Sequence, residues 1–429
     1  MKPVKITPND VLFLKDGKPM GTSNIGYGDS WPSATAFNAA LHLSLHRLST
    51  KKSIHKIDGK TMYWGDLQSI GLFPLQDGYT SYFPAPLDVI VKNDTSDNNC
   101  NVRLLPMKNS NNCSSLRSGL SLCMPLNEIS KKDKTPTWIS FNEYNEYAKS
   151  STHIKIKGKD NESFFSSEYA IGIAVDSATK VAQDAKLYSK TQLRLKQNCA
   201  MLGFIDFAST KKTHFDTDKY FEQVNYINLG GENRISEIEA LPSDITLPRG
   251  IRSNCVSSTL IKFVLLTPAV FPATKSGDKV IHSGGWLPNW ISPDSYKVNL
   301  LDGPGAAKAK RLCIPEGNPI NARLVSAIIG KKQDIVSGWS TGANGKSIGN
   351  KSTMLAVPAG SVYFFEADTI EDAKKLVSIL SWDSGTDTNN IVNRRSLFGE
   401  KGYGIGICAP WDWYENEKEN LKQKEYDAK

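Results

Sequence analysis

A glycine-rich stretch near the C-terminus constrains this chain more than any other feature. Residues 399–411 read Gly-Glu-Lys-Gly-Tyr-Gly-Ile-Gly-Ile-Cys-Ala-Pro-Trp, with a glycine at every second position from 402 to 406. Bare backbone in a strand indicates that something approaches it closely. We therefore predict a strand over 402–409 that either lies in a crowded core or contacts a partner. The basic residues and Tyr403 nearby would suit a nucleic acid.

The length and charge of the chain fit a globular protein of more than one domain. Its 429 residues exceed one ordinary domain, so about two to three are expected. An apolar content of 39% with 22% charged residues is enough to build a core. Lysine and arginine number 52 against 44 acidic residues, which gives a net charge of +8. This excess is compatible with a nucleic-acid partner but does not demand one.

Cysteine usage and hydropathy predict a cytoplasmic protein. The seven cysteines form no Cys-x-x-Cys pair and are odd in number, so neither a zinc site nor a disulfide framework is indicated. Such usage is typical of a reducing compartment. The N-terminal residues lack the apolar segment of a secretory signal. The most apolar run, 260–271, is too short to cross a bilayer.

The first half of the chain opens with a strand, a glycine-rich loop and a helix. The strand covers 3–14, the loop 21–29 and the helix 34–48, which Ser33 or Thr35 can cap. A loop of this kind places backbone N–H groups where an anion can bind.

A polar stretch and two further strands follow. Residues 92–136 are rich in Asn, Ser, Asp and Lys, which predicts a protruding insertion rather than core. A short helix is expected over 142–148. Alternating apolar residues predict strands over 168–177 and 192–207, with 180–189 crossing between them.

The second half resembles the first in its order of elements. We place the domain boundary between 238 and 257, in a connector rich in Pro and Gly. The elements predicted after it are strands over 259–266, 322–329 and 361–366, a helix over 369–380 and the final strand. The sequence thus predicts an α+β fold of two tandem ferredoxin-like (RRM-like) domains, 1–245 with the insertion and 246–414, followed by a charged tail at 415–429.

Two patterns resemble catalytic motifs but lack residues that those motifs require. Gly345-Lys346-Ser347 lacks the first glycine of a phosphate-binding loop, because Ser340 stands there. The same residues match a nucleophile elbow, but all six histidines precede it. This basic loop is therefore either a phosphate-contacting segment or an ordinary solvated one. His42 and His46 share a helix face; either one is a ribonuclease's general base or both are structural.

Seven short motifs occur in order over residues 5–411, and together they resemble a known family. They are Asn9–Pro19, Trp31-Pro32-Ser33, Gly230–Arg234, Thr267-Pro268-Ala269, Gly284–Pro288, Val357–Glu366 and Gly402-Tyr403-Gly404. The set resembles the RAMP superfamily of CRISPR–Cas proteins, and more narrowly the third subunit of the type III-B Cmr effector complex. The resemblance implies a non-catalytic protein without cofactor or metal. Such a subunit holds the repeat-derived 5′ handle of crRNA and docks the large Cas ten-type subunit and the backbone subunit.

Single-stranded RNA is best held by backbone N–H groups, by cations on its phosphates and by aromatic faces under splayed bases. Arg234 would either contact a phosphate or brace its own loop through an ion pair with Glu232. The alternative function is an RNA-processing endoribonuclease of the same superfamily, which needs a general base near the bound RNA. The candidate RNA-contacting residues are Lys15, Ser33, Gly230, Gly231, Arg234, Arg249, Arg252, Lys332, Trp339, Lys351, Arg394, Arg395, Lys401, Gly402, Tyr403 and Gly404.

Overall fold

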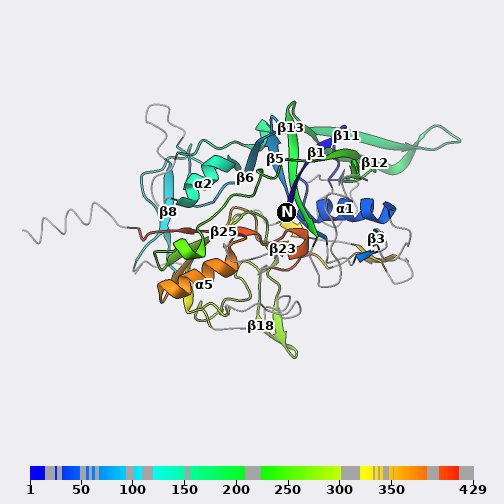
Figure 1. The fold of residues 1–429 in the computed structure, drawn as a ribbon. Helices are drawn as coiled ribbons and strands as arrows, with labels where there is room; N and C mark the ends of the chain where they lie inside the picture. Colours follow the sequence, from blue (N-terminus) through cyan, green and yellow to red (C-terminus); the bar gives the residue numbers. More distant parts are fainter. Residues whose placement is uncertain are drawn as a thin grey trace, which may run out of the picture.

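The protein has an α+β fold with several antiparallel sheets (Figure 1). This computed structural model describes residues 1–14, 25–26, 31–48, 55–57, 60–62, 67–92, 101–108, 119–149, 155–207, 224–300, 319–331, 334–336, 339–341, 347–350, 352–383 and 396–414. The α+β class predicted from the sequence is confirmed.

The largest sheet has seven strands in the order β10-β6-β5-β13-β1-β15-β14, and every pairing in it is antiparallel. The strands are β1 Lys2–Pro8, β5 Leu67–Gln76, β6 Thr80–Pro84, β10 Trp138–Ser140, β13 Cys199–Phe207, β14 Tyr226–Asn228 and β15 Ile235–Ala240. Helix α1, Ala34–Leu48, has the predicted bounds and packs on this sheet. The packing is close, because a Cβ at Gly203 in β13 would lie 2.6 Å from Cζ of Phe37.

A long two-stranded ribbon, the arm, projects from the body of the molecule (Figure 1). It is formed by β11, Phe165–Val175, and β12, Ala182–Leu195; the short strand β2, Ile25–Gly26, lies parallel to β12. The predicted crossing segment at 180–189 is wrong, since most of it belongs to β12. The single predicted strand at 192–207 is also wrong, because a turn with Asn198 at φ +61° separates β12 from β13.

The second sheet has the order β19-β24-β16-β25 and is also antiparallel. Its strands are β16 Leu260–Leu265, β19 Ala322–Ile328, β24 Val362–Ala367 and β25 Gly406–Pro410. Helix α5, Ile370–Leu380, follows β24 as predicted, and the Thr369 hydroxyl accepts a hydrogen bond from the Asp372 amide at 3.1 Å. A capping side chain of this kind satisfies one of the unpaired amides at a helix start.

The remaining elements are short. They are helix α2, Phe141–Lys149, where a helix was predicted; the 3-10 turns η1 Asn161–Ser163, η2 Ser253–Cys255 and η3 Gly399–Lys401; and the strands β3 His55–Ile57, β4 Lys60–Met62, β7 Val89–Ile90, β8 Val102–Pro106, β9 Cys123–Pro125, β17 Thr274–Ser276, β18 Lys279–His282, β20 Asp334–Val336, β21 Trp339–Thr341, β22 Ser347–Asn350 and β23 Met354–Ala356.

Alternate residues of the second sheet face two different cores. In β16, Ile261 and Phe263 join the core that contains α5, whereas Val264 joins the core of the first sheet. Successive side chains of a strand point to opposite faces, so Lys262 shares the face of Val264 and points toward the first half of the chain. Lys262 is fully buried there.

The buried Lys262 belongs to a charged cluster with Asp88 and Arg103, both of them also fully buried. The Tyr147 hydroxyl donates a 2.7 Å hydrogen bond to Asp88, and the Arg103 guanidinium lies 4.3 Å from the centre of the Tyr147 ring. Arg103 comes from β8, within the polar segment 92–136. The prediction that this whole segment protrudes is therefore wrong at 101–106, because Asp88 neutralises the one charge that would keep β8 at the surface.

Candidate nucleic-acid interface

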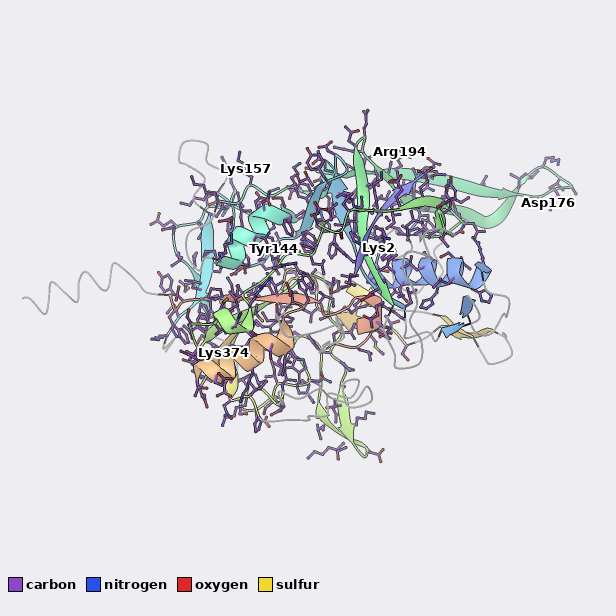
Figure 2. The ribbon with its side chains drawn as sticks, in the orientation of Figure 1. Lys2, Tyr144, Lys157, Asp176, Arg194 and Lys374 are labelled. Carbon is purple, nitrogen blue, oxygen red and sulfur yellow. The ribbon has the colours of Figure 1, made fainter. Side chains whose placement is uncertain are left out.

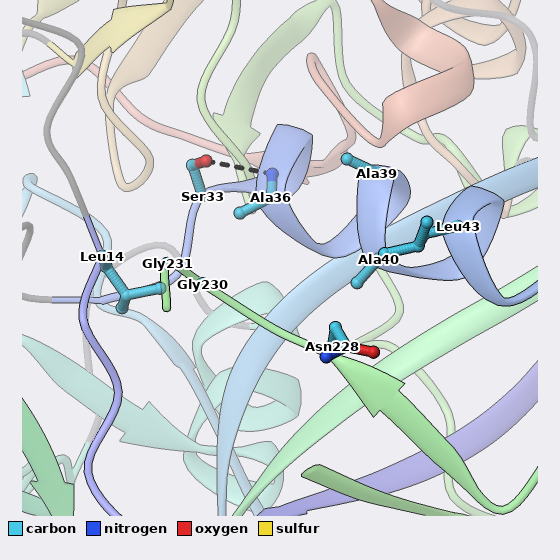
Figure 3. A pocket seen from close by; sticks show the side chains of 9 residues that line it. All are labelled: Leu14, Ser33, Ala36, Ala39, Ala40, Leu43, Asn228, Gly230 and Gly231. Atoms are coloured by element: carbon cyan, nitrogen blue, oxygen red, sulfur yellow. Dashed lines mark hydrogen bonds between the residues drawn. The ribbon is translucent and has the colours of Figure 1, made fainter. Parts of the chain in front are cut away.

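A surface groove of about 310 Å³ lies between α1 and the turn that follows β14 (Figure 3). It unites three of the candidate residues, Ser33, Gly230 and Gly231, which come from segments far apart in the sequence. The residues that line it are Leu14, Ser33, Ala36, Ala39, Ala40, Leu43, Asn228, Gly230 and Gly231. Small apolar walls with a hydroxyl and an amide at the rim can hold a flat, partly polar group such as a nucleobase.

The glycine turn is shaped by a close approach to Phe13. Gly230 has φ +83°, and a Cβ there would lie 2.6 Å from the Phe13 carbonyl oxygen. The Gly231 amide donates a 2.7 Å hydrogen bond to that same oxygen. These glycines are thus required by packing within the protein. They leave one wall of the groove without side chains, which lets a ligand approach the backbone.

The first turn of α1 forms the opposite wall. The Ser33 hydroxyl accepts a 3.2 Å hydrogen bond from the Ala36 amide and so caps the helix, as the sequence predicts (Figure 3). Ala39 and Leu43 are exposed toward the groove from the next two turns. At the far end, Arg47 Nη1 donates a 2.5 Å hydrogen bond to Oδ1 of Asn228. Arg47 thus places a cation beside the groove, and the sequence prediction missed it.

The glycine-rich terminal segment reaches the same helix from the other side, but not as a strand. Gly402 and Gly404 have φ +85° and +74°, so the predicted strand at 402–409 begins only at Gly406. A Cβ at Gly402 would lie 2.4 Å from the Ser69 carbonyl oxygen, and one at Gly404 would lie 2.3 Å from Cβ of Ser396. Of the two explanations offered for these glycines, this geometry matches crowding within the protein.

Tyr403 and Lys401 lie within this segment. The Tyr403 hydroxyl is 3.0 Å from that of Thr35 in α1, and its side chain is only 3% exposed. Its ring therefore packs inside the protein. Lys401 is half-buried, with Nζ 4.8 Å from the centre of the Phe398 ring. The segment supports the start of α1 rather than adding an aromatic platform to the surface.

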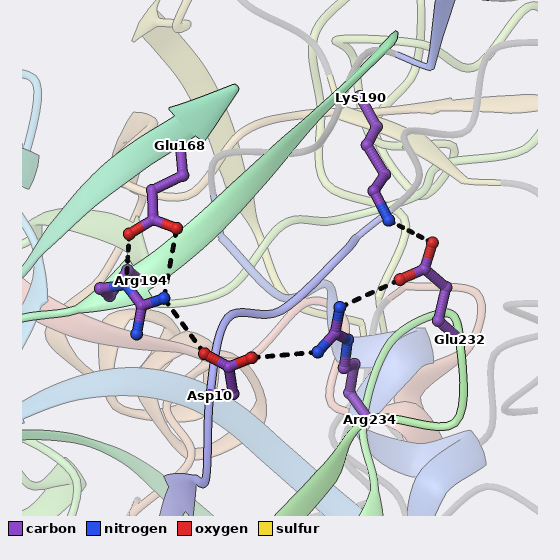
Figure 4. Close-up of polar contacts among 6 residues, drawn as sticks. All are labelled: Asp10, Glu168, Lys190, Arg194, Glu232 and Arg234. Atoms are coloured by element: carbon purple, nitrogen blue, oxygen red, sulfur yellow. Dashed lines mark hydrogen bonds and ion pairs between the residues drawn. The ribbon is translucent and has the colours of Figure 1, made fainter. Parts of the chain in front are cut away.

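Arg234 takes part in a chain of ion pairs at the root of the arm (Figure 4). Its Nη1 lies 3.1 Å from Oδ2 of Asp10, and its Nη2 lies 3.2 Å from Oε2 of Glu232. Glu232 also pairs with Lys190. Asp10 also forms an ion pair at 3.1 Å with Arg194 of β12, and Arg194 in turn pairs with Glu168 of β11.

The electrostatics of this chain favour its charged forms. The Lys190 ammonium, and then the Arg234 guanidinium, hold the pKa of Glu232 below its ordinary value. The pKa of Asp10 is lowered by the Val11 backbone amide first and then by its arginine partners. Both ends of the Arg234 guanidinium are thus occupied by carboxylates, which is the arrangement expected if Arg234 braces its loop.

Other candidate residues lie away from the groove or outside the described residues. Arg249 does not line the groove: its guanidinium pairs with Asp383 at 3.2 Å, and its backbone amide donates a 3.3 Å hydrogen bond to Oδ1 of Asn145 in α2. Arg252 is exposed beside η2 in the same connector. Trp339 lies in β21, but its side chain is outside the described part, as are the candidates Lys15, Lys332, Lys351, Arg394 and Arg395.

The described residues contain neither a metal-ligand cluster nor a helix that could span a membrane. No three His, Cys, Asp or Glu residues there are grouped closely enough to hold a metal ion. His42 is only 6% exposed, which agrees with a structural role. Among the helices in these residues, none has the length and apolar character needed to cross a membrane.

Comparison with known proteins gives one family and several solved structures. The family model described as CRISPR-associated protein (Cas_Cmr3) matches residues 4–411. Two chains of type III-B Cmr-beta structures bound to cognate target RNA, one also with AMPPnP, are 15% and 17% identical. They cover 95% and 94% of this chain and 99% and 95% of their own, with TM-scores of 0.46 and 0.45.

A more distant structural match comes from a type III-A complex. A chain of a Csm3-Csm4 subcomplex is 13% identical over 86% of this chain and 94% of its own, with a TM-score of 0.34. No curated protein sequence is significantly similar to this chain.

Proposed function

The chain belongs to the Cas_Cmr3 family of CRISPR-associated proteins, and we propose that it is a non-catalytic subunit of a cytoplasmic type III-B effector complex that binds the 5′ handle of crRNA. In this role it docks the large Cas ten-type subunit and the backbone subunit. The observation that carries RNA binding is the groove between α1 and the glycine turn, which unites Ser33, Gly230 and Gly231.

Two tandem ferredoxin-like domains, 1–245 and 246–414, are part of this proposal. A ferredoxin-like unit runs β-α-β-β-α-β and places its fourth strand beside the first, with the third and second beyond. The order β15-β1-β13-β5 in the large sheet and β25-β16-β24-β19 in the small one both follow that permutation. In each sheet the pairing is antiparallel, which supports the same assignment.

The chemistry of the groove suits an RNA base more than a phosphate. Its walls are mainly Ala and Leu side chains together with bare glycine backbone, and its polar groups are uncharged. Arg47 stands at the end of α1, where it can meet a phosphate of the same strand. Ser33, Gly230 and Gly231 would contact the RNA directly, and Arg234 would hold the turn that carries the two glycines.

Binding of a handle RNA to the purified chain tests the proposal. Ala39 is exposed in the groove, so Ala39→Glu places a negative charge against the RNA without disfavouring the helix. We expect about a tenfold loss of affinity, which corresponds to about 1.4 kcal/mol. Ala178→Glu, at the exposed tip of the arm, is the control with the same charge change. The logarithm of the affinity should fall with the logarithm of the KCl concentration, by about 0.7 for each phosphate contacted.

Two results would contradict the proposal. One is binding that Ala39→Glu and Ala178→Glu weaken equally, since that would reflect net charge alone. The other is metal-independent cleavage of repeat RNA by the purified chain, which would establish the processing endoribonuclease instead.

A further inference from the structure

One face of the arm exposes a row of apolar side chains in the part of the chain that the structure describes. Tyr169, Ile171 and Ile173 alternate along β11, and their side chains are 66%, 65% and 49% exposed. Residues two apart in a strand share a face, so the three form one row. Val175 continues the row toward the tip and is 53% exposed. Figure 2 places Asp176 at that tip, far from the body of the molecule.

The side chains that the structure describes on this face carry no charge. Thr191 and Ser189 of β12 lie opposite Tyr169 and Ile171, and both have neutral side chains. Directly opposed residues of an antiparallel pair lie on the same face. The charges at the root of the arm lie on the other face. Glu168 precedes Tyr169 in β11 and therefore points to that other face, where it lies opposite Gln192. The arm is therefore an amphipathic ribbon.

The arm is also held in a fixed direction at its root. Phe165 and Leu193 are buried in the core of the first sheet. Two of the ion pairs in Figure 4 lie at this root: Lys190 pairs with Glu232, and Arg194 of β12 pairs with Glu168. A surface that is positioned before binding loses less conformational entropy when a partner covers it.

Charge and side-chain type decide what the face can accept. Single-stranded nucleic acid is held by cations for its phosphates and by aromatic rings for its bases. Among its described side chains this face has no cation, and its exposed row is mostly branched aliphatic. Depletion of charge with exposed aliphatic and Tyr side chains is instead typical of the core of a protein–protein interface.

The area of the face argues against a second copy of this chain as the occupant. With about 3.4 Å per residue and strands about 4.8 Å apart, the face from 167 to 175 covers roughly 300 Å². Two such faces together would bury about 600 Å², well below the roughly 1,200 Å² of a stable interface. The face is large enough to be one part of a wider contact between different subunits.

We propose that this face of the arm, the row Tyr169, Ile171, Ile173 and Val175, docks onto an apolar, uncharged surface of a neighbouring protein subunit in the effector complex. This proposal rests on the proposed function, because membership of the complex supplies the partner. It separates the two tasks of the chain. The groove beside α1 binds RNA, and the apolar face of the arm fixes the chain among its protein neighbours.

The test uses the complete complex, co-expressed with crRNA and its remaining subunits. A photo-crosslinking benzoyl-phenylalanine introduced at Ile171 identifies the class of molecule that covers the face. We expect a crosslink to a protein subunit. In competition with the wild-type chain, the double variant Ile171→Thr/Ile173→Thr should enter the complex about tenfold less well. Thr keeps strand propensity, so the arm should stay folded.

The matched control is Ala170→Thr, which places the same residue on the opposite face of the arm. It should enter the complex as the wild-type chain does. Binding of handle RNA to the isolated chain should be unchanged in all three proteins, so a failure of RNA binding is distinguishable from a failure of docking. A crosslink to RNA, a crosslink to a second copy of this chain, or undiminished incorporation of the double variant would overturn the proposal.

Discussion

Nζ of Lys262 in β16 lies 2.8 Å from Oδ2 of Asp88, and neither side chain is exposed to solvent. Arg103 reaches the same carboxylate oxygen at 3.2 Å. One carboxylate thus faces two cations where the second sheet packs on the first half of the chain. Burial, followed by repulsion from Arg103, lowers the pKa of Lys262 to about 7, although Asp88 opposes the shift.

Removal of the carboxylate should cost far more stability than removal of the lysine. Asp88→Asn leaves the buried Arg103 guanidinium without a counter-charge and lowers the pKa of Lys262 further, so we expect a loss of about 3–5 kcal/mol in the free energy of unfolding. Lys262→Met leaves the Asp88–Arg103 pair and removes a costly charge, so its effect should stay within about 1.5 kcal/mol of zero. Denaturant unfolding measures both. Equal losses in the two variants would contradict this account of the cluster.

The stability of the protein should depend on pH through Lys262. The folded chain releases this proton near pH 7, whereas the unfolded chain keeps it up to the ordinary pKa of 10.5. Between these values the unfolded state binds more protons, so the contribution of Lys262 to stability increases as the pH rises. The melting temperature of the wild-type chain should therefore rise relative to that of Lys262→Met between pH 6.5 and pH 9. Parallel curves would show that Lys262 keeps an ordinary pKa.

Substitution of Gly404 should reveal internal crowding in the terminal segment. An alanine there meets both an unfavourable φ of +74° and Cβ of Ser396 at 2.3 Å. Gly277, in the turn between β17 and β18, has φ +59° but no atom within 4 Å of the added Cβ. Gly277→Ala should cost about 1 kcal/mol for the backbone conformation alone. We expect Gly404→Ala to cost at least about 1 kcal/mol more, and similar melting temperatures would show that Ser396 yields without cost.

Arg234→Ala should affect the glycine turn more than the electrostatic part of RNA binding. Its partners Asp10 and Glu232 are about half exposed, so the melting temperature should fall by less than about 4 °C. Because both ends of the guanidinium are occupied, the dependence of RNA affinity on KCl should keep its slope. A slope smaller by about 0.7 would instead identify Arg234 as a phosphate contact. Fluorescence anisotropy at several KCl concentrations distinguishes the two results.

Local signals in the sequence predicted the helices and much of the second sheet. Helix α1 was predicted from Ser33 and the apolar spacing behind it, and α5 from Thr369 and the acidic residues that follow. The position of strand β16 in the sequence was predicted from its run of apolar residues. These features are set by side chains within one or two turns of the chain, so a linear pattern contains them.

The candidate site could be predicted only in part. The sequence singled out Ser33 and the glycine turn at Gly230, but their meeting across the groove depends on α1 packing on the first sheet. The glycines at 402 and 404 were recognised as sites of close approach. What approaches them, the Ser69 carbonyl and the Ser396 side chain, comes from other parts of the chain.

The sequence by itself determined the α+β class, the two main helices and the positions where bare backbone is required, because each depends on near neighbours along the chain. The tertiary structure alone decided that Arg103 in a polar stretch is buried, and that Ile171 in an apolar row is exposed. Burial depends on contacts between distant segments. Asp88 and Lys262, 174 residues apart, meet only because the second sheet packs against α2 and the segment around Asp88 in the first half of the chain.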